Sequence, residues 1–157
     1  MTDRHKRLAL LAAILGSFVA GLDATAVNVA LPAIEQDLGG GLAGQQWVSN
    51  AYLLTLGSLI LVGGSLGDIY GERRIFALGV SLFGVFSVAC ALAPTIEALI
   101  AARALQGAAG ALLTPSALAI IVAAFPLRER AAAIGTWTAW GGIGMCQRLL
   151  TPLFSIQ

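Results

Sequence analysis

Long apolar runs separated by short polar connections dominate the chain. No charged residue occurs between Gln45 and Gly67, and none occurs between Ile75 and Ile96. A membrane-spanning helix needs about 20 predominantly apolar residues to cross roughly 30 Å of hydrocarbon, and these runs are long enough. The pattern therefore predicts an all-α, polytopic membrane protein with about five transmembrane helices. Their approximate ranges are 8–31, 46–67, 75–93, 96–125 and 131–147.

Prolines and aromatic residues set the expected ends of these helices. Pro32 is expected to close the first helix, and Pro94 marks a tight turn before the fourth. Pro115 lies within the fourth helix, where a helix bundle tolerates proline. Trp47 and Tyr52 are expected to open the second helix at the depth where aromatic side chains gather at a membrane surface.

Composition supports a lipid-embedded protein. Of the 157 residues, 58% are hydrophobic and 11% are charged, whereas a soluble domain carries about a quarter charged residues. The lipid bilayer is therefore an expected partner. The net charge of +1 gives no electrostatic reason to expect a nucleic-acid partner. Cys90 and Cys146 lie in apolar segments and are expected to be buried thiols that fill space, not a disulfide.

The placement of charge along the chain predicts the topology. Basic residues precede the first helix and occupy the second and fourth connections: Arg4, Lys6, Arg7, Arg73, Arg74, Arg128 and Arg130. The first connection carries Glu35 and Asp37, and the third carries Glu97. Because basic connections remain in the cytoplasm, the N-terminus is expected there. The basic start could also be that of a secretory signal peptide. The apolar stretch continues past Asp23 to Ile34, however, which favours an uncleaved helix.

Two ionisable residues, Asp23 and Arg103, lie inside predicted helices. Charges within a bilayer are costly, so such residues usually face a bundle interior or a watery cavity. Asp23 lies about 12 Å below the outer end of its helix and Arg103 about 10 Å, at 1.5 Å per residue. Similar depths allow the two residues to pair or to share a cavity. Alternatively, Arg103 reaches toward the outer interface and Asp23 is a structural hydrogen-bonding group.

The fourth helix carries a polar and small-residue stripe. The residues of the stripe recur at helical spacing: Arg103, Gln106, Gly107, Gly110 and Thr114. Small residues in lipid let helix backbones approach closely, so Gly107 and Gly110 are expected to mediate helix packing. The interactions of an aspartate and an arginine beside such a cavity depend on what occupies the cavity. That dependence is required for coupling a proton to a second substrate.

The connection between the second and third helices is short, glycine-rich and charged. Residues 64–74 read Gly-Ser-Leu-Gly-Asp-Ile-Tyr-Gly-Glu-Arg-Arg. Together with residues 22–34, 103–107 and 128–131, this segment resembles the major facilitator superfamily, most closely its fourteen-helix drug:proton antiporters. The four segments occur in the family's order, from the first-helix motif to the basic loop before the fifth helix. The resemblance implies a partial helix bundle of the major facilitator type.

The resemblance also implies roles for individual residues. It places Asp23, Arg103 and Gln106 in proton and substrate coupling. It assigns a cytoplasmic gating loop to Gly64, Asp68, Gly71, Arg73 and Arg74. The implied function is multidrug efflux by drug:proton antiport through alternating access, with the proton gradient as energy source and no cofactor. Lipophilic small molecules are the implied substrates, and a bacterial plasma membrane is the implied location.

The sequence departs from the family pattern at several points. Ile69 and Glu72 stand where the gating loop commonly has basic residues, and Ala109 takes a place often held by glycine. Residues 145–157 form an atypical tail, in which Arg148 and Pro152 interrupt the fifth span. The tail is expected to result from a truncation, a frameshift or a deliberate cut. Residues 1–157 are therefore interpreted as an incomplete N-terminal half that does not transport by itself. The alternative is a small, non-transporting membrane protein that assembles with partner helices. An enzyme is not expected, because no nucleophile–base pair is visible.

Overall fold

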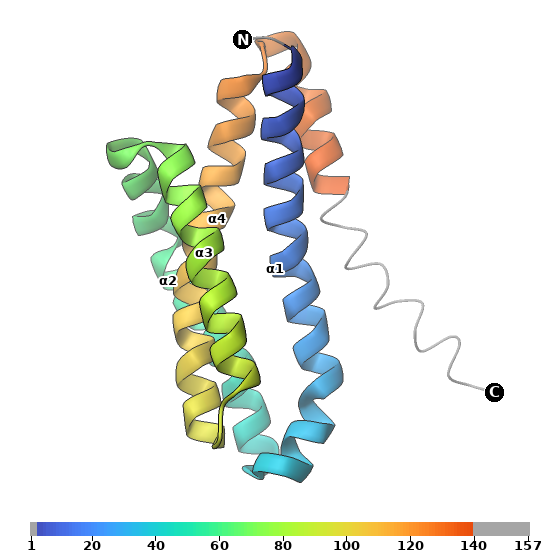
Figure 1. The fold of residues 1–157 in the computed structure, drawn as a ribbon, viewed down its shortest axis with the longest axis vertical. Coiled ribbons are helices and arrows are strands. Elements are labelled where there is room, and N and C mark those ends of the chain that lie inside the picture. The colour runs from blue at the N-terminus through green and yellow to red at the C-terminus, as the bar shows by residue number, and fades with distance from the viewer. Residues whose placement is uncertain (1–2, 140–157) are drawn as a thin grey trace, which may run out of the picture. The chain divides into compact units, whose positions relative to one another are not determined.

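The computed structural model describes residues 3–139, and every regular element in that range is helical. The long helices are α1 (Asp3–Leu38), α2 (Gly41–Tyr70), α3 (Glu72–Ala91) and α4 (Ile96–Ala124) (Figure 1). Residues 127–139 form the start of a further helix. The all-α class is thus confirmed for the described residues. The predicted end of the fifth helix at 147 and the tail 145–157 lie outside them.

Within the part of the chain that the structure describes, three helices have the length and composition of membrane spans. The most apolar windows of α2, α3 and α4 have mean hydropathies of 1.5, 1.9 and 1.8. Of the three spans, α4 is the most buried, with 56% of its window inside the protein against 17% for α2 and α3.

The first helix ends later than its proline suggested. Pro32 lies inside α1, which continues to Leu38, so the predicted end at residue 31 is wrong. The helix stops instead at Gly39, Gly40 and Gly41, whose φ angles of 70°, 94° and 57° lie in the left-handed region that glycine adopts without strain. At 36 residues, α1 is about 54 Å long, so its ends extend beyond the hydrocarbon. The side chain of Gln45 donates a hydrogen bond to the Glu35 carboxylate across this turn.

The second helix begins before its aromatic residues. It starts at Gly41, so Trp47 and Tyr52 lie within it and do not open it. Trp47 is 55% exposed, as a residue facing lipid would be, but Tyr52 is only 6% exposed. The expected aromatic belt therefore does not include Tyr52. The five-residue spacing rotates these side chains by about 140° around the helix, which takes Tyr52 to the packed face.

The chain divides into two compact units, and each is described separately. The central unit is Val27–Ser116, and the terminal unit combines Met1–Ala26 with Ala117–Gln157. In the central unit α2, α3 and the first part of α4 run alongside one another (Figure 1) around a core that includes Val48, Phe83 and Leu113.

The described part of the terminal unit has its own contacts. Ala13, Ile121 and Ala133 are buried there. The Trp137 indole N–H donates a hydrogen bond of 2.8 Å to the Ser17 hydroxyl, which joins residues that are far apart in the sequence.

Candidate functional site

A buried arginine is the centre of the candidate site. Arg103 on α4 is 2% exposed. Its Nη1 donates a hydrogen bond of 2.7 Å to the Oε1 atom of Gln106, one turn further along the same helix. The guanidinium carbon also lies 4.5 Å from the centroid of the Tyr52 ring, which belongs to α2. The structure therefore brings together two residues that the sequence predicted for the site and one that it did not.

These contacts offset the cost of holding a charge within the membrane. That cost is at least about 2.5–3.5 kcal/mol at the centre of a spanning helix. A hydrogen bond to a charged group contributes about 1.5–3 kcal/mol. A desolvated cation over an aromatic ring contributes about 2 kcal/mol. The two contacts together are large enough to hold Arg103 in the protein, so it need not extend to the membrane surface.

Gln106 joins a third helix to the site. Its side chain is fully buried, and the same Oε1 atom accepts a hydrogen bond from the thiol of Cys90 on α3, with 3.5 Å between Sγ and Oε1. Cys90 was expected only to fill space, but its thiol is a weak donor to this amide. We call Tyr52, Cys90, Arg103 and Gln106 the arginine cluster. Three helices of the central unit contribute to it.

Glycines on α4 make room for Tyr52. A β-carbon at Gly107 would lie 3.1 Å from the Tyr52 carbonyl carbon and would also meet the carbonyl oxygen and the Thr55 hydroxyl. A β-carbon at Gly110 would lie 3.4 Å from the Tyr52 hydroxyl. Both glycines thus lie at the α2–α4 interface. Thr114, which was expected to continue the stripe, is exposed, so the buried stripe does not extend to it.

A second close approach between α2 and α4 lies further along both helices. Pro115 has no N–H, so it leaves the carbonyl of Ala111 without its usual helical donor. Gly63 of α2 packs directly on that carbonyl: a β-carbon at Gly63 would lie 2.9 Å from the Ala111 carbonyl carbon. A glycine Cα–H can contribute a weak hydrogen bond at such a contact. The significance of Gly63 is not visible in the sequence, because it depends on which α4 carbonyl faces it.

The predicted gating loop is a tight junction between α2 and α3. Gly71 has φ 94° and ψ 124°, and its N–H donates to the Gly67 carbonyl at 2.9 Å. Asp68, Arg73 and Arg74 are exposed around it. A β-carbon at the remaining predicted loop residue, Gly64, would lie 3.7 Å from the Pro115 side chain, which is ordinary contact.

Glu72 has a structural role that the sequence did not indicate. Its carboxylate folds over Gly67, where a β-carbon would lie 2.7 Å from Glu72 Cδ. Its Oε2 atom is buried without a hydrogen-bond partner in the structure. Glu72 is also the first residue of α3, where a negative charge interacts favourably with the helix dipole. Glu72 reduces the positive charge of the loop, and it also packs against α2 at the junction.

Asp23 and the arginine cluster belong to different units of the chain. Asp23 is a half-buried residue of α1 in the terminal unit, whereas Arg103 belongs to the central unit. Their pairing stays a prediction. The last described helix begins at residue 127, so its predicted start at 131 is wrong, and the basic residues expected to precede it lie in its first turn. There Arg130 Nε donates to the Phe125 carbonyl at 3.0 Å, and Arg128 is exposed.

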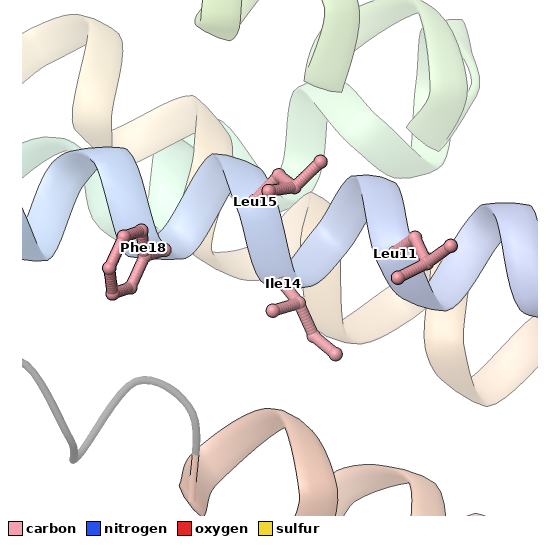
Figure 2. A pocket seen from close by; sticks show the side chains of 4 residues that line it. All are labelled: Leu11, Ile14, Leu15 and Phe18. Atoms are coloured by element: carbon pink, nitrogen blue, oxygen red, sulfur yellow. The ribbon is translucent and has the colours of Figure 1, made fainter.

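An apolar pocket of about 290 Å³ lies against α1 in the terminal unit. Figure 2 shows its lining side chains, which all come from one stretch of that helix: Leu11, Ile14, Leu15 and Phe18. None of these side chains carries a polar group. These four described side chains therefore offer contacts to hydrocarbon.

The sequence of residues 13–155 matches the Major Facilitator Superfamily. The match covers most of the chain, which therefore belongs to that superfamily and is an integral membrane protein. This confirms the family that the four motifs indicated.

Relatives include proteins named for drug resistance or antibiotic transport. The multidrug resistance protein Stp of Mycobacterium tuberculosis (strain CDC 1551 / Oshkosh) is 46% identical over 143 residues, which cover 90% of this chain and 27% of that protein. The probable actinorhodin transporter of Streptomyces coelicolor is 46% identical over 140 residues, or 88% of this chain and 24% of that protein. The puromycin resistance protein pur8 of Streptomyces alboniger is 41% identical over 149 residues, or 94% and 30%. The chain thus spans between 24% and 30% of the length of these relatives.

Proposed function

We propose that this chain is the N-terminal portion of a proton-coupled multidrug efflux transporter. The observation that carries the proposal is the buried guanidinium of Arg103, which Gln106 and Tyr52 contact inside the protein. A cation kept at that depth is costly, and such residues mark substrate or ion pathways in membrane proteins. The resistance and transport names of the relatives agree with drug export.

In the proposed mechanism, Asp23 carries the proton, and Arg103 and Gln106 respond to whether proton or drug is bound. A bound lipophilic drug alters the solvation of charged groups that line its cavity. Proton release and drug binding then become mutually dependent. The coupling needs no cofactor, because the proton gradient supplies the energy.

The gating loop would operate on the cytoplasmic side. Arg73 and Arg74 lie exposed at the α2–α3 junction, and basic connections remain in the cytoplasm of bacterial cells. In this orientation the N-terminus lies on the cytoplasmic side of a bacterial plasma membrane. Asp68, exposed at the end of α2, is available to interact with basic groups or helix N-termini elsewhere in the transporter.

A polypeptide of residues 1–157 alone is not expected to transport. Alternating access requires two repeats that rock around a site near the middle of the membrane, and about five helices do not supply them. The alternative of a small membrane protein that assembles with partner helices predicts a defined oligomer or complex in detergent. The resistance and transport names of the relatives do not favour it.

The experiment compares the chain alone with a chimera. In the chimera, this chain replaces the matched segment of the multidrug resistance protein Stp. Cells expressing the chimera should expel a lipophilic drug, and cells expressing residues 1–157 alone should not. Efflux by the chain alone would overturn the requirement for two repeats. A chimera that reaches the membrane but expels no drug would overturn the proposed function.

A further inference from the structure

Tyr52 belongs to the arginine cluster but to none of the motifs that identified the family. Its ring lies under the guanidinium of Arg103, with 4.5 Å between Cζ and the ring centroid. The side chain is 6% exposed, so this contact is inside the protein and shielded from solvent. The face of an aromatic ring carries negative potential, which attracts a cation placed over it.

We propose that Tyr52 is the positioning residue of Arg103. Gln106 holds one guanidinium nitrogen from within α4, and Tyr52 holds the guanidinium plane from α2. Two contacts from different directions fix the head of a long, flexible side chain much more strongly than either contact alone. The consequence for export rests on the proposed function, whereas the contact between ring and guanidinium does not.

The packing of α2 on α4 determines where the ring lies. The carbonyl of Tyr52 lies against Gly107, and its hydroxyl lies against Gly110. Both ends of the residue are therefore set by places where α4 has no side chain. A larger residue at either glycine would displace the ring from Arg103.

This arrangement connects helix movement to the environment of the charge. If α2 moves against α4 during alternating access, the ring moves with α2, and Gln106 stays with Arg103 on α4. The guanidinium then loses or regains its contact with the Tyr52 ring. The interactions of Arg103 therefore depend, through Tyr52, on the conformation of the helix bundle.

The first test uses the whole chain and a spectroscopic signal. The chain contains two tyrosines, Tyr52 and Tyr70, so labelling with 3-fluorotyrosine should give two fluorine resonances, which the variant Tyr70→Phe assigns. Tyr70 is 60% exposed and serves as an internal control. The substitution Arg103→Gln should shift the Tyr52 resonance and leave that of Tyr70 in place. The matched control is Leu105→Gln, at a half-exposed position of the same helix, which should shift neither. A Tyr52 resonance unaffected by Arg103→Gln would overturn the proposal.

The second test separates the electrostatic role of the ring from its size. In the chimera with Stp, phenylalanine at position 52 keeps the ring, and 3,4,5-trifluorophenylalanine keeps nearly the same shape but removes the negative potential of its face. Efflux should persist with phenylalanine and fall about tenfold with the fluorinated residue. Equal efflux by the two would show that Tyr52 only fills space and would overturn its positioning role. An unsubstituted chimera that expels no drug would instead refute the proposed function, and the fluorine spectra would still decide the contact.

Discussion

Substituting Gly63 by alanine should separate α2 from α4. The new methyl group would lie 2.9 Å from the Ala111 carbonyl carbon and 3.3 Å from the Leu112 Cα atom. Ordinary contacts between carbon atoms are about 3.5–4.0 Å, so these two atoms alone require the backbones to part by at least about 0.5–1 Å. The Ala111 carbonyl oxygen lies nearer still to the new methyl group. Because the obstructing atoms belong to the α4 backbone, no side-chain rotation relieves the overlap.

The magnitude follows from two opposing terms. Alanine in place of glycine within a helix stabilises it by about 0.5–1 kcal/mol. Overpacking a tight interface costs about 1–3 kcal/mol. The control is Gly57→Ala on the same helix, where a β-carbon meets nothing within 4 Å, so only the favourable term applies. The free energy of unfolding of Gly63→Ala should therefore lie about 1–3 kcal/mol below that of Gly57→Ala.

The assay is reversible unfolding of the chain in detergent, followed by circular dichroism. Both variants replace glycine by alanine in α2, so differences in micelle environment and in helix propensity largely cancel. If Gly63→Ala proved as stable as Gly57→Ala, α2 and α4 would not approach each other closely at this point.

Three further predictions concern side-chain contacts, and each is measured by the same unfolding assay. Gln106→Leu should destabilise the chain by about 1.5–3 kcal/mol, because the buried guanidinium loses a hydrogen-bond acceptor. Gln106→Glu keeps an acceptor and should retain stability, so equal stability of the two variants would contradict the hydrogen bond between Arg103 and Gln106. Gly67→Ala should destabilise the α2–α3 junction, and adding Glu72→Ala should restore much of the loss, so additive effects would show that the two residues do not touch. Trp137→Phe should cost about 0.5–1.5 kcal/mol through loss of the hydrogen bond to Ser17, and Ser17→Ala should add little to it.

The apolar pattern was sufficient to predict the class of fold and the approximate place of each described helix. The predictions from this pattern are wrong where a general rule is applied to a single residue. Pro32 was read as a helix end, but a long helix can contain a proline, and three consecutive glycines with positive φ provide the actual end. Glycine conformations of this kind depend on how the chain turns, which the proline rule does not capture.

The stripe on α4 was predictable in part because helical spacing places Arg103, Gln106 and Gly107 on one face. Their partners on α2 were not predictable from that spacing. Tyr52 was grouped with Trp47 as an interfacial aromatic residue, although it shares a helical face with Val48 and not with Trp47. Only the packing of α2 on α4 shows that this face meets the arginine.

The central claim is that Arg103 couples drug export to protons, and the chimera in proteoliposomes tests it most directly. An imposed pH gradient should drive drug movement by the unsubstituted chimera, and Arg103→Gln should abolish it. Arg128→Gln removes an exposed cation and should leave transport intact. Drug movement by Arg103→Gln that is undiminished and still driven by the pH gradient would contradict the account.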